Sequence, residues 1–116
     1  MIDASALLRE ARQELARLPS LLDGVVTGLS PARWRARPAP DEWSAVEIVC
    51  HLRDEEAEDF GARIRVLLGG GARFAPIDPQ GWATARHYHA ADPIEALAAF
   101  HRHRTESLTM LTEATV

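Results

Sequence analysis

The architecture is clearest in the middle of the chain, in the stretch Trp43-Ser44-Ala45-Val46-Glu47-Ile48-Val49-Cys50-His51-Leu52-Arg53-Asp54. Ser44 and Glu47 are spaced as a capping box. In this motif the serine side chain accepts a hydrogen bond from the backbone amide of the glutamate, and the glutamate side chain accepts one from the backbone amide of the serine. This start signal predicts a helix that runs to about Leu68, where Gly69-Gly70-Gly71 ends it. Apolar residues cover more than half of its circumference, which is typical of a helix at the centre of a bundle or at a subunit interface.

The remainder of the sequence also reads as helical. Apolar residues recur at helical spacing from Ala4 to Leu29 and stay in phase across Pro19, which predicts one kinked helix or two short helices end to end. A last helix starts at Asp92-Pro93, with Asp92 as N-cap, and runs almost to the end of the chain. Between these elements we expect an extended connector over 31–40 and a short helix over 80–88.

No alternation of apolar and polar residues is long enough to predict a hairpin strand. We therefore expect one all-α domain over residues 1–116, an up-down bundle of three long helices and a short one. Trp34 and Trp43 flank the connector, either as anchors that pin it to the bundle or as walls of a ligand pocket. Trp82 and Tyr88 are expected to be buried contacts of the short helix.

Composition excludes several classes of protein. The 116 residues carry a net charge of −4, and all 13 basic residues are arginines. That balance argues against a nucleic-acid-binding protein, which needs a basic face for the phosphates. No apolar run is long enough to span a bilayer, no leader is visible at the N-terminus, and the single Cys50 excludes a disulfide framework. We expect a cytoplasmic domain with no membrane contact, in which Cys50 is a buried structural thiol.

Histidines and carboxylates are the candidate functional groups. His51 lies one helical turn before Glu55, one turn after Glu47 and two turns before Glu58, and imidazole and carboxylate at this spacing can share a divalent metal. The alternative is a solvated acidic face with His51 paired to Glu55 or Glu47. Both interpretations remain open at this point.

The other histidines point less clearly to chemistry. His101 lies within an apolar stripe. It is interpreted as a core residue that makes one hydrogen bond or, alternatively, as a metal ligand. His103 lies on a polar face and is expected to be solvated. His87 and His89 could meet at a metal only if the chain is extended there, because residues two apart on a helix point in different directions.

The stretch from Arg37 to Asp54 resembles the DinB/YfiT-like superfamily. It has a proline-tryptophan entry, a helix that opens with Trp-Ser-x-x-Glu at Trp43, and His-Leu-x-Asp beginning at His51. Further matching residues are Trp82, Arg86, Tyr88, Asp92, Pro93, Phe100 and Arg104. The likeness extends from about Leu15 to Leu111 and is most specific between Trp43 and Asp54.

The resemblance implies a four-helix bundle, commonly dimeric, that binds a divalent metal through three histidines. One of these corresponds to His51, and the family's other two lie on its fourth helix. Family members with known activity include thiol-dependent transferases and isomerases. A zinc, nickel or iron ion is the cofactor that this resemblance implies, and a small molecule such as a thiol is the implied substrate.

This sequence departs from the family pattern because it ends at Val116, shortly after the third long helix. His101 and His103 do not occupy the positions of the missing histidine pair, so only His51 carries over as a metal ligand. The chain is then a short form or fragment, a bundle completed by a second subunit, or a member that has lost the metal. A bundle lacking one helix exposes an apolar groove, and we expect a homodimer with the second helix near the contact.

Two functions follow from this sequence. The first is a metal-dependent transferase or hydrolase with His51 as ligand and Glu55 or Glu58 in support. The second is a non-catalytic helical module that dimerises or binds a partner through its open groove. A small nucleic-acid regulator is disfavoured by the acidic charge.

Overall fold

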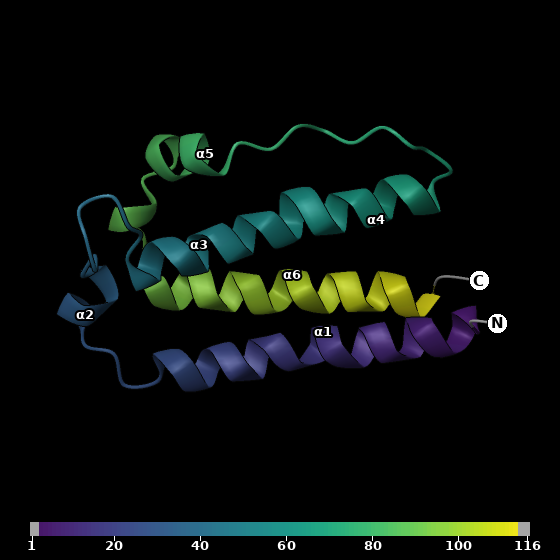
Figure 1. Cartoon of the computed structure of the whole chain (residues 1–116), viewed down its shortest axis with the longest axis horizontal. Coiled ribbons are helices and arrows are strands. Elements are labelled where there is room, and N and C mark those ends of the chain that lie inside the picture. Colours follow the sequence, from purple (N-terminus) through teal and green to yellow (C-terminus); the bar gives the residue numbers. More distant parts are fainter. Residues whose placement is uncertain (1–2, 114–116) are drawn as a thin grey trace.

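Three long helices lie side by side in the computed structural model, which describes residues 3–113 (Figure 1). They are α1 (Ala4–Val26), the rod formed by α3 (Ala45–Glu55) and α4 (Gly61–Leu68), and α6 (Pro93–Glu113). α6 lies in the middle and packs against both neighbours. No strand occurs within the described residues, so the prediction of an all-α bundle is confirmed.

α1 is one helix, which decides between the two predictions for this segment. Asp3 caps it by accepting a hydrogen bond from the Ser5 amide at 3.0 Å, and Pro19 lies inside the helix. Among residues 3–113, no helix is long and apolar enough to cross a membrane.

The apolar stripe of α1 is only partly covered. Val26 is buried, whereas Leu7, Leu21 and Val25 are 55%, 64% and 76% exposed. α1 packs mainly along α6, so the apolar residues turned away from α6 remain in contact with water. An apolar row of this kind on a folded helix marks a surface that another segment or protein can cover.

The sequence predicted an extended connector after α1. In the structure the connector is not extended throughout. Residues Pro31–Arg35 form a short helix, α2, because Ser30 caps it and proline is favoured at the first helical position. Trp34 on this helix is buried in the core, so its interpretation as an anchor is confirmed.

The second long helix starts and ends where the capping box and the glycines predicted. The Glu47 carboxylate accepts hydrogen bonds from the Ser44 amide at 3.1 Å and the Ser44 hydroxyl at 2.9 Å. Its regular winding is interrupted by a π-helical turn, η1 (Glu56–Phe60), which the sequence analysis did not predict. π turns insert an extra residue into a helix and occur frequently at functional sites.

A buried ion pair joins this turn to the other helices. Arg104 of α6 donates to Glu56 at 3.0 Å and to the backbone carbonyl of Leu15 in α1 at 2.6 Å. The side chains of Arg104 and Glu56 are 9% and 3% exposed. Gly61 follows the π turn, and a Cβ there would lie 2.7 Å from the Glu56 carbonyl oxygen, so the backbone is too close for a larger residue.

The segment between the second and third long helices folds back onto α3 (Figure 1). It contains α5 (Pro79–Ala85) and a 3₁₀ turn, η2 (Tyr88–Ala90), in place of one continuous helix over 80–88. Tyr88 is fully buried and Trp82 packs against the core, as predicted. Asp92 then caps α6 by accepting from the amides of Ile94 and Glu95.

The core lies where α2, α3, η2 and the first turns of α6 meet. Cys50 is buried in it, as predicted, and burial raises the pKa of its thiol. The buried members of this core are Val26, Trp34, Val46, Val49, Cys50, Tyr88 and Ala96.

Candidate functional site

His51 lies on α3, one helical turn after Glu47. Its ring is half-buried and packs against Trp43, with ring centroids 5.1 Å apart and planes tilted by 51°. The side chain of Ile48, one turn earlier, is 43% exposed. Within residues 3–113, no hydrogen bond involves the nitrogens of the His51 ring.

The expected pairing of His51 with Glu47 or Glu55 is wrong, because both carboxylates have other partners. Arg37 donates to both Glu47 oxygens, at 2.8 and 3.2 Å. Burial opposes ionisation of Glu47, but the hydrogen bonds from Arg37 and Ser44 outweigh it and lower its pKa to about 2. Glu47 is therefore a structural carboxylate.

Glu55 forms a carboxyl pair with Asp59, one turn further along the rod. Protonated Glu55 donates a hydrogen bond to the Asp59 carboxylate; this bond and partial burial raise the pKa of Glu55 to about 7, and the same bond lowers the pKa of Asp59. The Glu55 Oε2 atom is buried and has no hydrogen-bond partner in the described part of the chain. Carboxylates held in this way tend to occur at functional sites, although structural networks also produce them.

These donors do not complete a metal site by themselves. No three His, Cys, Asp or Glu side chains among residues 3–113 are close enough together to hold one ion. His51 provides one imidazole, and Glu55 and Asp59 follow one and two turns further along the rod. A three-ligand site of the kind that the family resemblance implies does not fit these residues alone, so no reaction step is assigned to a metal here.

The remaining histidines have structural partners or face the solvent. His101 makes the predicted single hydrogen bond, to Asp23 of α1 at 2.8 Å, but it is not the expected core residue, because its side chain is 37% exposed. His103 lies 3.6 Å from Glu106, and His89 bonds to the carbonyl of Arg35 at 2.9 Å. His87 is exposed with a φ of 52°.

Asp54, the last residue of the His-Leu-x-Asp motif, is the centre of a buried polar network. It accepts from Arg53 at 2.8 Å, from Arg86 at 2.9 Å and from the Tyr88 hydroxyl. Burial of Asp54 opposes its ionisation, but these hydrogen bonds outweigh it and lower its pKa. Arg86 also binds Glu58, at 3.1 Å. Glu58 is thereby tied to the segment after α5 and does not join His51.

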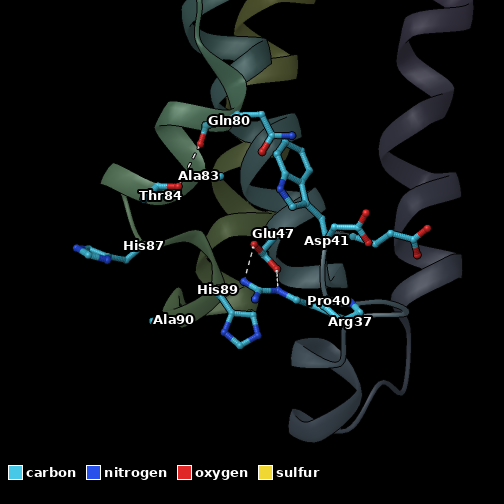
Figure 2. A pocket seen from close by; sticks show the side chains of 12 residues that line it. Arg37, Pro40, Asp41, Glu47, Gln80, Ala83, Thr84, His87, His89 and Ala90 are labelled. Carbon is cyan, nitrogen blue, oxygen red and sulfur yellow. Dashed lines mark hydrogen bonds and ion pairs between the residues drawn. The ribbon is translucent and has the colours of Figure 1, made fainter.

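A solvent-open cavity of about 420 Å³ lies beside Trp43 (Figure 2). Its walls come from the connector between α2 and α3, the first turn of α3, and α5 with η2. Trp43 therefore lines a cavity in addition to contacting His51, and its role in a ligand pocket stays a prediction. Sequence reasoning missed three further lining residues, Arg37, Gln80 and Thr84, because they converge only when the segment after α4 folds back.

The fold and these residues together define a class of protein, an all-helical bundle with one histidine and a carboxyl pair along the same helical rod. A family model described as the DinB superfamily matches residues 14–116, and the chain belongs to that superfamily. The match confirms the resemblance found in the sequence around Trp43 and His51. A comparison with curated proteins finds no match.

A solved structure shares the fold. It is described as YfiT from Bacillus subtilis, a probable metal-dependent hydrolase with an unusual four-helix bundle topology, and it matches with a TM-score of 0.80 at 20% sequence identity. The match covers 99% of this chain and 65% of YfiT, so the chain spans slightly less than two thirds of that protein's length. At this identity the likeness shows the fold alone.

Proposed function

We propose that this protein is a divalent-metal-dependent hydrolase or transferase that acts on a small molecule such as a thiol, with His51 as a metal ligand. The observation that carries the proposal is the state of the His51 ring. It is partly buried against the Trp43 ring, and neither nitrogen is used by a hydrogen bond within residues 3–113. Family membership supports the same assignment.

Glu55 is the second donor that we propose. Its buried Oε2 has no partner, and it lies one helical turn from His51. Residues one turn apart on a helix are neighbours and can share a ligand. A divalent cation would also remove the cost of ionising a carboxyl whose pKa is about 7.

The remaining ligands are proposed to come from outside residues 3–113, in the simplest case from a second copy of the chain. The exposed apolar side chains of Leu21, Val25 and Ile48 support an assembly, because packing against a partner would remove them from water. A bound zinc, nickel or iron ion would supply a Lewis acid that polarises a substrate or activates a thiol or water. His51 and Glu55 would hold and orient that ion.

Metal binding by untagged protein tests this proposal. We expect zinc or nickel to bind, and His51→Ala to weaken binding by more than about 100-fold, since loss of groups that merely orient a ligand already costs roughly 10–100-fold. His103→Ala is the matched control, because it removes an imidazole from α6 that lies beside Glu106. Equal affinity of wild type and His51→Ala would contradict the proposal.

A second candidate is a non-catalytic module that dimerises through its exposed apolar side chains. The specific observation in its favour is that residues 3–113 assemble no group of three metal donors. This candidate predicts a dimer by light scattering in metal-free buffer and no metal-dependent change in that state. A monomer under both conditions would exclude it, whereas dimerisation that requires metal and His51 would favour the enzyme.

A further inference from the structure

The cavity beside Trp43 is a candidate binding site that is separate from the proposed metal ligands. Neither His51 nor Glu55 lines it, and its volume of about 420 Å³ is sufficient for a small molecule. One of its lining residues is Glu47, which is 4% exposed and is held in place by a hydrogen bond from the Ser44 amide at the start of α3. The cavity is therefore a preformed feature of the fold.

One side of this cavity offers hydrogen-bond donors. Arg37 uses Nε and Nη2 to bind Glu47, and its third nitrogen, Nη1, has no partner among residues 3–113. The Arg37 side chain is 41% exposed, so Nη1 is available to a ligand. His89 lies on the Arg37 side of the cavity, whereas His87 points away from the Arg37–Glu47 pair (Figure 2). A planar guanidinium held rigidly by one carboxylate is suited to binding another.

The lining of the cavity also includes acceptors and an aromatic residue. Asp41 and Glu42 line it, both are exposed, and neither side chain has a hydrogen-bond or ion-pair partner within the described residues. Trp43 contributes its indole next to them. Carboxylates beside a tryptophan form a favourable environment for an ammonium group, through charge and through cation–π attraction.

We propose that this cavity binds a small zwitterion that carries both a carboxylate and an ammonium group, of the size of an amino acid. The carboxylate contacts Arg37 and the ammonium group contacts Asp41, Glu42 and Trp43. A simple anion would meet the repulsion of the two unpaired carboxylates. The charge of Arg37 is already balanced by Glu47, so a simple cation is not repelled, but it would leave Arg37 Nη1 without a partner. A ligand with both charges can use both kinds of group, which is why the zwitterion is favoured.

A series of ω-amino acids tests the proposal, since their charges are separated by chains of increasing length. The probes are glycine, β-alanine, 4-aminobutyrate and 5-aminopentanoate, with butyrate and butylamine as controls that each carry one charge. Binding is followed by calorimetry and by the indole N–H signal of Trp43 in NMR spectra, assigned with Trp43→Phe. We expect at least one zwitterion to bind about tenfold or more tightly than both controls, a factor that corresponds to roughly 1.4 kcal/mol.

Three variants locate the site. Asp41→Asn removes an exposed charge and is expected to weaken zwitterion binding severalfold, while the weak binding of butyrate becomes stronger because one repelling carboxylate is gone. Arg37→Gln combined with Glu47→Gln removes both charges of the ion pair together, so that neither is left buried alone, and is expected to abolish the preference for a carboxylate. Glu10→Gln, an exposed change on α1, is the matched control and should have no effect.

The possible outcomes separate this proposal from the metal proposal. Zwitterion binding that survives His51→Ala but is weakened severalfold in Asp41→Asn supports the cavity, whatever the metal experiment shows. Equal binding of butyrate or butylamine, a failure of all four zwitterions to bind, or full retention of binding in Asp41→Asn would each overturn it. Circular dichroism confirms that every variant retains its helical content.

Discussion

Tyr88 donates its phenolic hydroxyl to the carboxylate of Asp54, and this hydrogen bond joins η2 to α3 inside the core. Tyr88 is completely buried, and both burial and the nearby Asp54 raise the pKa of its hydroxyl, which therefore remains a donor at neutral pH. The same carboxylate binds Arg86, so a single side chain of α3 holds the end of the returning segment at two points. Because α5 and η2 form one wall of the cavity, this attachment also sets the shape of the cavity.

Tyr88→Phe tests the strength of this attachment. The variant keeps the buried ring but removes one hydrogen bond to a charged acceptor, which is expected to lower the free energy of unfolding by about 1.5–3 kcal/mol. Urea denaturation provides the measurement. Thr84→Val is a control, because it removes an exposed hydroxyl on α5 whose acceptor is one turn away in the same helix. Equal stability of Tyr88→Phe and wild type would show that water replaces this contact.

Glu55→Gln is expected to make the metal-free protein more stable, and increasingly so as the pH rises. The pKa of Glu55 is raised from 4.5 to about 7 by folding, so the folded protein holds this proton more tightly than the unfolded chain does. Ionisation of Glu55 consequently reduces stability between pH 4.5 and about 7. Glutamine cannot ionise and can still donate to Asp59.

Denaturation of both proteins at pH 5 and pH 8, with a chelator present, measures this difference. The advantage of Glu55→Gln should be larger at pH 8 than at pH 5. An advantage that does not change with pH would mean that Glu55 titrates normally in the folded protein. The chelator is needed because a bound cation would favour the ionised form and hide the effect.

Arg104→Met is expected to destabilise the fold severely. The substitution leaves the Glu56 side chain, which is 3% exposed, without its ion-pair partner. Removing one partner of a buried ion pair typically lowers the free energy of unfolding by about 3–5 kcal/mol. The double variant Arg104→Met with Glu56→Gln should recover much of that loss, because no unpaired charge remains. Thermal denaturation of Arg104→Met, Glu56→Gln and the double variant measures the coupling between the two side chains as a double-mutant cycle. Additive effects would show that the two side chains are not coupled.

Two glycine substitutions test the π turn. Gly61→Ala places a Cβ 2.7 Å from the Glu56 carbonyl oxygen, and the backbone shift that relieves this contact is expected to cost about 1–3 kcal/mol. Gly24→Ala is the matched control, since nothing lies within 4 Å of a Cβ at this position of α1. The control should gain roughly 0.5–1 kcal/mol, because glycine is unfavourable within a helix. A similar gain for both variants would contradict the close backbone contact at Gly61.

Local sequence signals predicted the helices well because the physical causes of their boundaries lie within a few residues. The capping box at Ser44, the Asp92-Pro93 start and the glycines at 69–71 each act on their own helix end. The π turn escaped prediction because it depends on the close approach of the backbone at Gly61 and on an ion pair between Glu56 and Arg104, 48 residues apart.

The candidate site could be predicted only in part for the same reason. His51 was identified from a local motif, whereas its direct pairing with Glu47 was wrong, because Arg37 reaches Glu47 from the connector. The cavity was foreseen only as an alternative role for Trp43. Its other walls depend on how the segment after α4 returns, and the signal that could have found them is Arg86-x-Tyr88, which pairs with Asp54.

The most direct test of the proposed function is a crystal structure of the metal-loaded protein, with diffraction recorded at the absorption edge of the metal. We predict an anomalous peak about 2.0–2.1 Å from a ring nitrogen of His51. At least one further ligand should come from outside residues 3–113, with Glu55 on the same side of the ion. A metal bound elsewhere, with water alone around the His51 ring, would contradict the proposed role of this histidine.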